Sequence, residues 1–248
     1  MMETGRQNGY TLIEMVLVII ILGILAGVAY KTLGSTIDVG RVEETKAEME
    51  QLACAIAGNP DLVSNGTRTD FGYLGDVGAL PPNWNALIAN PGGYATWKGP
   101  YIQDESSGGV TYEFSLDAWG KPYTSPNGAA FSSTGGPETI TRVLANSNDD
   151  LLRNPVMVTV TDVDGTLPGV AYRDSVDLIL TYPNGAGGLA TVVRHPSANG
   201  LARFDSIPVG LQRLQILCHP GNDTIQRKIA INPGQAMYVD VRHFGNLW

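Results

Sequence analysis

An apolar run from Leu12 to Tyr30 constrains this chain more than any other feature of its sequence. Every residue in the run is apolar or glycine except Glu14. Nineteen residues at about 1.5 Å each form a helix roughly 30 Å long, enough to cross the hydrocarbon core of a bilayer. A lone carboxylate inside such a span costs about 2.5–3.5 kcal/mol on insertion scales. The run therefore predicts a membrane helix, and Glu14 requires a specific role.

Two simple interpretations of the run are open. It is either a single-pass anchor, whose Glu14 lies near the interface and reaches water, or a secretory signal peptide. The signal peptide is disfavoured because the run is too long and has no small-x-small cleavage site at its end.

The residues at the start of the run favour a third interpretation. A nine-residue polar leader ends in Gly9, and Tyr10-Thr11-Leu12-Ile13-Glu14 follows it directly. This combination resembles the signature of type IV prepilins and pseudopilins. The resemblance implies that a prepilin peptidase cuts after Gly9 and that Tyr10 becomes the N-methylated first residue. The family usually has phenylalanine at that position, and tyrosine keeps the ring.

The same resemblance implies a role for Glu14. It lies four residues from the new amine of Tyr10, a spacing that places both groups on one helix face. In the family, the carboxylate pairs with the amine of its own or a neighbouring subunit. Low dielectric makes this pairing strong and makes either charge alone costly. Glu14 is therefore predicted to act in assembly rather than in catalysis.

The helix is expected to continue beyond the apolar run, because apolar residues recur at three- and four-residue steps up to Ile56. Gly58-Asn59-Pro60 is a stop signal. The chain is therefore predicted to contain a leader (1–9), a transmembrane and assembly helix (10–59), a pseudopilin-like domain (60–154) and a β-sandwich (155–248).

Two motifs in the middle of the chain carry a second resemblance. Trp97-Lys98-Gly99-Pro100-Tyr101 and Asp117-Ala118-Trp119-Gly120-Lys121-Pro122-Tyr123 resemble the W-K-G-P-Y and D-P-W-G-x-P-Y elements of the major pseudopilin of type II secretion. Ala118 replaces the proline of the second element. The resemblance implies a small antiparallel sheet packed on the long helix. A short helix is expected at 83–90, with strands at 111–116, 121–125 and 129–133.

A loop near the end of this region implies a calcium ion. Ser133-Thr134-Gly135-Gly136-Pro137 and the later Asn148-Asp149-Asp150 resemble the loop that binds calcium in that family. The implied ligands are Glu138, Asp149 and Asp150, since hard cations prefer oxygen donors. Glu138 stands where the family has Asp-Gly, and the spacing to Asp149 is longer. The alternative is that the two aspartates cap a turn or short helix without metal, and Asp117 is expected to be a turn residue.

The last part of the chain has the pattern of a β-sandwich. Val156, Val158 and Val160 alternate with Met157, Thr159 and Thr161, and turn signals separate six further short strands up to Arg242. Such spacing predicts an all-β Greek-key sandwich, and an α+β fold for the whole chain. Residues 199–216 resemble carboxypeptidase regulatory-like (transthyretin-like) domains, which are accessory modules.

Several functions are disfavoured by the sequence. A net charge of −8 argues against binding to nucleic acid. Phosphate-binding, nucleophile-elbow and zinc-protease motifs are all missing, so an enzyme is not expected. Cys54 and Cys218 are interpreted as separate thiols, with a disulfide as the alternative. The three histidines, His195, His219 and His243, are interpreted as solvated loop residues.

These features predict a structural subunit of a type IV pilus-like or type II secretion pseudopilus filament. Its expected partners are copies of itself, the prepilin peptidase, an inner-membrane assembly platform and membrane lipid before assembly. The precursor is expected in the inner (cytoplasmic) membrane, and the filament outside it. The alternative is a minor or tip pilin whose sandwich acts as an adhesin. A third hypothesis is an unprocessed membrane-anchored protein that binds or hydrolyses sugars.

Overall fold

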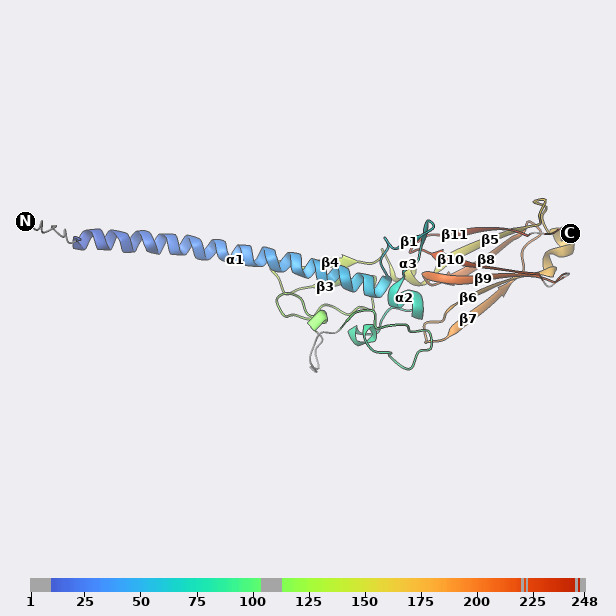
Figure 1. The fold of residues 1–248 in the computed structure, drawn as a ribbon, viewed down its shortest axis with the longest axis horizontal. Coiled ribbons are helices and arrows are strands. Elements are labelled where there is room, and N and C mark those ends of the chain that lie inside the picture. The colour runs from blue at the N-terminus through green and yellow to red at the C-terminus, as the bar shows by residue number, and fades with distance from the viewer. Residues whose placement is uncertain (1–9, 104–112, 220, 222, 244, 246–248) are drawn as a thin grey trace, which may run out of the picture.

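The computed structural model describes residues 10–103, 113–219, 221, 223–243 and 245, with the backbone alone at 29–35. One long helix, α1 (Leu12–Ala57), projects from a β-rich remainder. Its second half is packed against short elements, and a sandwich of strands lies beyond its C-terminal end (Figure 1). The predicted α+β class is confirmed.

Both ends of α1 follow from local chemistry. At the start, Thr11 has extended backbone and caps the helix. At the end, Gly58 has φ +80° and its N–H donates to the Cys54 carbonyl at 2.8 Å. A Cβ at Gly58 would lie 2.4 Å from the Asp70 carbonyl oxygen, so glycine is required there. Arg68 Nη2 donates to the Gly58 carbonyl at 3.1 Å, which satisfies an orphan group of the helix end.

The second half of α1 forms part of a hydrophobic core. Met49, Leu52, Ala53 and Ile56 are buried, as their spacing predicts. They pack in one cluster with aromatic side chains from the following segments, including Tyr73, Tyr123 and Phe131. We call α1 from residue 38 onward, together with residues 58–153, the body.

After α1, the described residues of the body form only short elements. They are β1 (Val63–Ser64), β2 (Thr67–Arg68), α2 (Gly72–Val77), the 3-10 helices η1 (Trp84–Leu87) and η2 (Glu113–Ser115), β3 (Ala130–Ser133), β4 (Ile140–Val143) and α3 (Asn148–Leu152). β3 pairs with β4, and β1 with β2, both antiparallel.

Two of the strands expected in the body are absent from its described residues. Of the strand expected at 111–116, residues 113–115 form η2, and 111–112 lie outside the described residues. At 121–125 an isolated bridge between Leu116 and Pro122 replaces the expected strand. A tight turn around Asp117 separates the two segments, so they meet as a short loop instead of a ladder. The helix expected at 83–90 and the strand at 129–133 are present as η1 and β3.

The sandwich consists of seven strands in two sheets. One sheet has the order β10-β9-β6-β7, and the other has the order β11-β5-β8. Inward residues of both sheets form one core, including Val158, Leu180, Phe204, Leu214 and Val241. β11 pairs with β5 in parallel, a feature that strand patterns do not predict. The bounds are β5 (Asn154–Thr161), β6 (Val176–Pro183), β7 (Leu189–Arg194), β8 (Leu201–Ile207), β9 (Gly210–Cys218), β10 (Asp223–Ile231) and β11 (Met237–Arg242).

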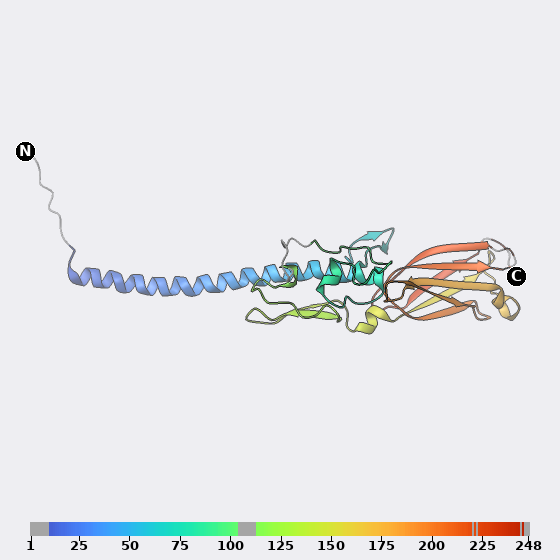
Figure 2. The ribbon, with the colours of Figure 1, turned by 90° about the horizontal axis from the view of Figure 1, so that it is seen from below.

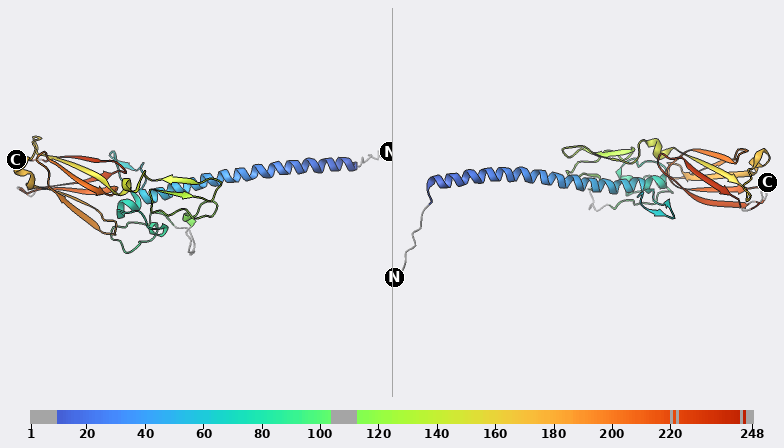
Figure 3. Two further views of the ribbon diagram at one scale, coloured as in Figure 1. Left: turned by 180° about the vertical axis from the view of Figure 1, so that it is seen from behind. Right: turned by 90° about the horizontal axis from the view of Figure 1, so that it is seen from above.

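An apolar cluster joins the body to the sandwich. Phe71 and Leu74 of the body are buried against Val209 and Ala230 of the sandwich. The Val209 N–H also donates to the Leu151 carbonyl at 3.0 Å. The sandwich therefore extends the molecule beyond the end of α1, as views from below, behind and above show (Figures 2 and 3).

Candidate assembly interface

The first half of α1 is an apolar rod that stands away from the body (Figure 1). Leu12, Ile19 and Ile24 are 83%, 67% and 63% exposed, and the other large apolar side chains up to Val28 are also exposed. Such a surface, much larger than the patches found on monomeric soluble proteins, needs a cover of lipid or of other chains.

No helix in the described part of the chain is both long enough and apolar enough to cross a bilayer. The membrane span expected at Leu12–Tyr30 therefore stays a prediction.

Glu14 lies at the exposed start of this rod. Together with Thr11 it forms a capping box: the Glu14 N–H donates to Thr11 Oγ1, and the Thr11 N–H donates to Glu14 Oε2, both at 3.4 Å. The carboxylate is thus turned back toward the N-terminus, close to Tyr10, which is 80% exposed. Gly9 lies outside the described residues. This geometry leaves Glu14 free to meet a cation on its own or another chain.

Asp117 organises the loop that the second pseudopilin-like motif forms. Its side chain is buried, and its carboxylate accepts four hydrogen bonds. Within the motif, the N–H groups of Trp119 and Lys121 donate to Oδ1 at 3.1 and 2.9 Å. From the following loop, Ser133 Oγ and the Gly135 N–H donate to Oδ2 at 2.6 and 3.0 Å. The expected turn role of Asp117 agrees with this geometry.

The same motif is bonded to α1. The Ala118 N–H donates to Thr45 Oγ1 at 3.2 Å, and the Tyr123 hydroxyl donates to Glu48 Oε2 at 2.7 Å. Burial raises the pKa of Glu48, although the bond from Tyr123 opposes the rise. The motif is therefore a clamp that holds the loop region against the second half of α1.

The first pseudopilin-like motif is also held in place by side-chain contacts with the rest of the body. Trp97 Nε1 donates to the Ala86 carbonyl at 3.0 Å, and the Trp97 and Tyr101 rings meet edge to face. The Tyr101 hydroxyl donates to Asp76 Oδ2 at 3.0 Å, and Lys98 Nζ lies 2.5 Å from Asp76 Oδ1. Both rings are partly buried against the core of the body, and their polar contacts fix the loop to α2.

The proposed calcium ligands do not converge. Asp149 and Asp150 lie in the first turn of α3, where Asp150 Oδ2 accepts the Ser147 N–H at 3.1 Å and completes a capping box. Glu138 is exposed in the loop before β4. Among the described residues, no group of three His, Cys, Asp or Glu side chains is placed to hold a metal ion. Asp150 therefore caps a short helix, which is the alternative stated above. The arrangement of Glu138, Asp149 and Asp150 does not fit a calcium ion.

Removal of calcium is accordingly expected to leave thermal unfolding unchanged. An ion present at a hundred times its Kd would stabilise the fold by about 2.7 kcal/mol, which is roughly 5–10 °C for a chain of this size. Unfolding should be followed by circular dichroism with EDTA and with added calcium. A loss of several degrees in EDTA that calcium but not magnesium restores would contradict this expectation.

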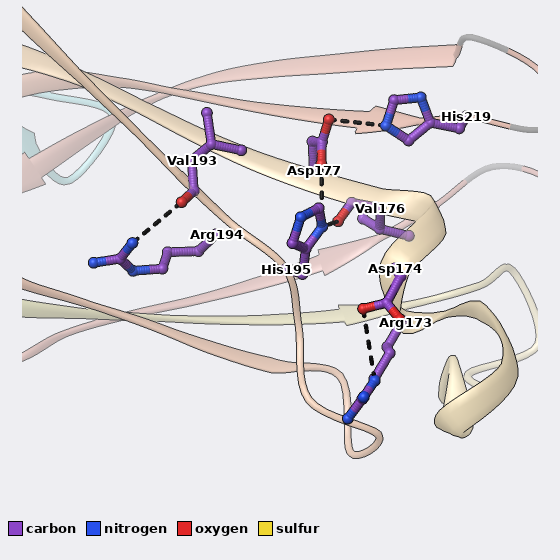
Figure 4. Close-up of polar contacts among 8 residues, drawn as sticks. All are labelled: Arg173, Asp174, Val176, Asp177, Val193, Arg194, His195 and His219. Carbon is purple, nitrogen blue, oxygen red and sulfur yellow. Dashed lines mark hydrogen bonds and ion pairs between the residues drawn. The ribbon is translucent and has the colours of Figure 1, made fainter.

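Two histidines that we interpreted as solvated loop residues meet on one carboxylate (Figure 4). His195 Nδ1 lies 3.1 Å from Asp177 Oδ1, and His219 Nε2 lies 2.8 Å from Asp177 Oδ2. Both histidines are exposed and lie just after β7 and β9, as interpreted, whereas the interpretation was wrong for His243, which is buried. Pairing of β6 with both β7 and β9 brings the strand ends together, and no local sequence signal reports such pairing.

The two cysteines are separate thiols. Cys54 is half-buried and Cys218 is buried, and both are free. Burial raises the pKa of the Cys218 thiol to about 11, which makes it a poor nucleophile.

Comparison with known proteins identifies the N-terminal segment. Residues 4–30 match the prokaryotic N-terminal methylation motif. Type II secretion system core protein G of Pseudomonas aeruginosa is 29% identical over 122 residues, which cover 49% of this chain and 75% of the relative. The chain is a homologue of this pseudopilin over about half its length. Core protein G of Xanthomonas campestris pv. campestris is 27% identical over 121 residues, 47% of this chain and 74% of the relative.

Solved structures give weaker likenesses. The Bacillus anthracis TIE protein has a TM-score of 0.30 at 11% identity, covering 47% of this chain and 23% of that one. BcpA*(D312A), the major pilin subunit of Bacillus cereus, has a TM-score of 0.24 at 17% identity, covering 50% and 40%. The chain spans less than half the length of either structure.

The motif and the homology support a subunit of a pseudopilus or pilus. They imply self-assembly into a filament and processing by a prepilin peptidase, and they fit a membrane-anchored precursor. Pilin and pseudopilin homologues are structural subunits, so the prediction that the chain is not an enzyme is confirmed.

Proposed function

We propose that the chain is a structural subunit of a type II secretion pseudopilus or a type IV pilus-like filament. The precursor is inserted in the inner membrane by residues 10–59, cut after Gly9 and N-methylated at Tyr10. It then assembles through α1, with Glu14 paired to an N-terminal amine. Residues 60–154 form the pseudopilin-like domain, and residues 155–248 form a sandwich of the transthyretin-like type.

One observation carries this proposal: an exposed apolar rod with a single carboxylate at its start. The large apolar side chains from Leu12 to Val28 are all exposed, between 45% and 83%, on every face of the helix, which suits a surrounding of lipid or of like helices. Glu14 is the only ionisable side chain in this stretch. An uncharged rod would serve equally well as an anchor, so the carboxylate points to assembly.

The physical chemistry of assembly follows from the exchange of lipid for neighbouring helices. Both surroundings are apolar, so moving the rod from one to the other changes little hydrophobic free energy. The difference is that a neighbour supplies a cationic amine at the depth of Glu14. Pairing of the two charges removes an unpaired charge from a medium of low dielectric. The amine therefore favours filament over membrane and sets the axial position of each subunit.

Processing is the direct test of this function. In cells with an active prepilin peptidase, the mature chain is expected to begin at Tyr10 and to carry one added methyl group, as mass spectrometry of the N-terminal peptide would measure. A Gly9→Ala chain provides the control, because its leader should be retained. Retention of Met1–Gly9 in the unmodified chain would instead support the anchored-protein hypothesis.

A tip subunit with an adhesive sandwich is the second candidate. The observation in its favour is an apolar loop at the end of the sandwich that faces away from the body, where Val170 and Tyr172 of α4 (Gly169–Tyr172) are 73% and 43% exposed. Cryo-electron microscopy of sheared filaments separates the two candidates. Copies along the whole filament support the first, and single copies at the ends support the second.

A further inference from the structure

Two cations lie side by side on the outer face of the four-stranded sheet. In the pairing of β9 with β10, Arg213 lies directly opposite Lys228, and both residues are exposed. Like charges in directly opposite positions destabilise a pair of strands. In the described part of the chain, neither side chain forms an ion pair with a carboxylate. The fold therefore carries a local cost that a partner with negative charge would remove.

Carboxylates near this pair already have other partners. Lys228 borders a cavity of about 240 Å³ at the joint with the body, which Asp70 and Asp76 also line. Asp76 is bound by the first pseudopilin-like motif, and Asp70 accepts two backbone N–H groups. Toward the far end of the sheet, Asp177 meets the two histidines described above (Figure 4). These three carboxylates leave Arg213 and Lys228 without a counter-charge.

The rows of the sheet beside the cation pair are uncharged, and none of their outward residues is buried. These residues come from all four strands of the sheet and are Thr181, Thr191, Ile179, Val193, Gln215, Gln226, Leu217 and Thr224. We call these eight residues, together with Arg213 and Lys228, the sheet face. The sheet face offers a partner apolar and polar contacts with an excess of two positive charges.

The body has the opposite charge. Residues 38–153 contain fifteen Asp and Glu and seven Lys and Arg, so the body carries the whole net charge of −8. Bodies of copies packed side by side therefore repel each other. Cations placed against a body remove part of this repulsion, and opposite charges across an interface also determine which surfaces meet.

The shape of the molecule brings the sheet face level with the body of another copy. The sandwich lies beyond the C-terminal end of α1, and the body lies alongside the second half of that helix (Figures 1 and 2). Subunits of a helical filament repeat head to tail, so a contact between neighbours joins two different surfaces. When parallel copies are shifted along α1 by the length of the body, the sandwich of one copy lies beside the body of another.

We propose that the sheet face docks on the body of another copy in the filament, with Arg213 and Lys228 against carboxylates of that body. This proposal rests on the filament function. The contact links subunits through the sandwich, outside the bundle of apolar rods, and it lowers the repulsion between acidic bodies.

Zero-length cross-linking with a carbodiimide tests the contact, because this reagent joins a lysine amine only to a carboxylate that touches it. Sheared filaments and detergent-dispersed full-length chain are treated alike, and the linked peptides are identified by mass spectrometry. We expect links from Lys228 to carboxylates of residues 38–153 that are at least about tenfold more abundant in filaments than in the dispersed chain. Links that are equally abundant in both states, such as those to Asp70 or Asp76 of the same chain, are internal to one copy.

Arg213→Gln and Arg203→Gln form a matched pair of variants. Each removes one exposed arginine from the outer face of a sandwich sheet, but Arg203 lies on the other sheet and is paired with Asp205 at 2.7 Å. Arg213→Gln keeps Lys228 as the reporter and is expected to reduce the filament-specific links about fivefold, the upper range for one exposed ion pair. Arg203→Gln should leave these links unchanged, and both variants should keep the circular dichroism spectrum of the parent chain.

Filaments in which Lys228 forms no link to the body of another copy would overturn the proposal and leave the filament function intact. So would links only to carboxylates of the sandwich or of a different protein. An equal loss of links in both variants would also overturn it, since the contact would not then depend on the sheet face. If the chain forms no filament, the proposed function is wrong, and this proposal fails with it.

Discussion

Replacing Glu14 by alanine is expected to leave membrane insertion and cleavage after Gly9 intact, and to reduce the yield of filaments about a hundredfold or more. Breaking a buried ion pair by removing one partner costs about 3–5 kcal/mol, and each 1.4 kcal/mol is about a factor of ten in an equilibrium. In the variant the carboxylate is gone, so the amine of the neighbouring subunit stays buried without a partner. This unpaired charge raises the free energy of the assembled filament. The measurement is the amount of sheared filament against the amount of processed chain in the membrane.

Two further variants separate charge from capping at this position. Glu14→Gln keeps an oxygen that completes the capping box with Thr11 but removes the charge. It is expected to behave like Glu14→Ala if ion pairing matters and like the parent chain if capping matters. Glu44→Ala, which removes an exposed carboxylate later in the same helix, should assemble normally. Normal filament numbers with Glu14→Ala would refute the pairing role.

Replacing Asp117 by alanine is expected to destabilise the body by about 3 kcal/mol or more. The substitution leaves four donors without their acceptor in a buried place, and each unsatisfied buried group costs about 1–3 kcal/mol. The loss corresponds to roughly 6–12 °C in Tm for a chain of this size. Thermal unfolding of the detergent-dispersed chain measures it.

Asp61→Ala is the matched control for that experiment. Asp61 is an exposed aspartate of the body, and substitutions of this kind usually change stability by less than about 0.5 kcal/mol. An Asp117→Ala chain that unfolds at the parent temperature would show that Asp117 is not the organiser of the loop.

Acid unfolding offers a second measurement of the same residue. Burial by itself raises the pKa of the Asp117 carboxyl, but hydrogen bonds from Ser133 and three backbone N–H groups outweigh it, and the pKa lies below its usual value. The usual value is about 3.9. A depressed pKa contributes stability that is fully present above about pH 4 and is lost as the pH falls through the folded-state pKa. The stability difference between the parent chain and Asp117→Asn should therefore shrink below about pH 4. A constant difference down to pH 2 would contradict this assignment.

Much of the fold could be predicted because it depends on patterns of residues that are close together in the sequence. The core positions Met49, Leu52 and Ile56 follow from a period near 3.6, and Gly58 ends the helix because only glycine tolerates its φ and its close neighbours. The seven strands of the sandwich follow from a period of two between turn signals. The motif at Gly9–Glu14 likewise points to pilin-type processing, because it combines a cleavage signal with an apolar run.

The remaining features depend on segments that are distant in sequence. The capping role of Asp150 was left open, because a carboxylate beside a glycine-rich loop serves an ion or a helix end equally well until the backbone is placed. Asp177 meets His195 and His219 only because β6 pairs with two other strands. The strand expected at 121–125 is reduced to a single bridge, because the Asp117 side chain accepts hydrogen bonds from both sides of the loop and holds a tight turn just before it.

The sequence by itself determined a long helix with an apolar first half, a pseudopilin-like set of motifs and a seven-stranded module, since each depends on neighbours within a few residues. Only the tertiary structure decided how the sandwich joins the body, through Phe71, Leu74, Val209 and Ala230, and which strands lie at the edges of its two sheets. Strand order and domain contact are set by burial of surfaces that meet across long stretches of chain. No local pattern records which surface meets which.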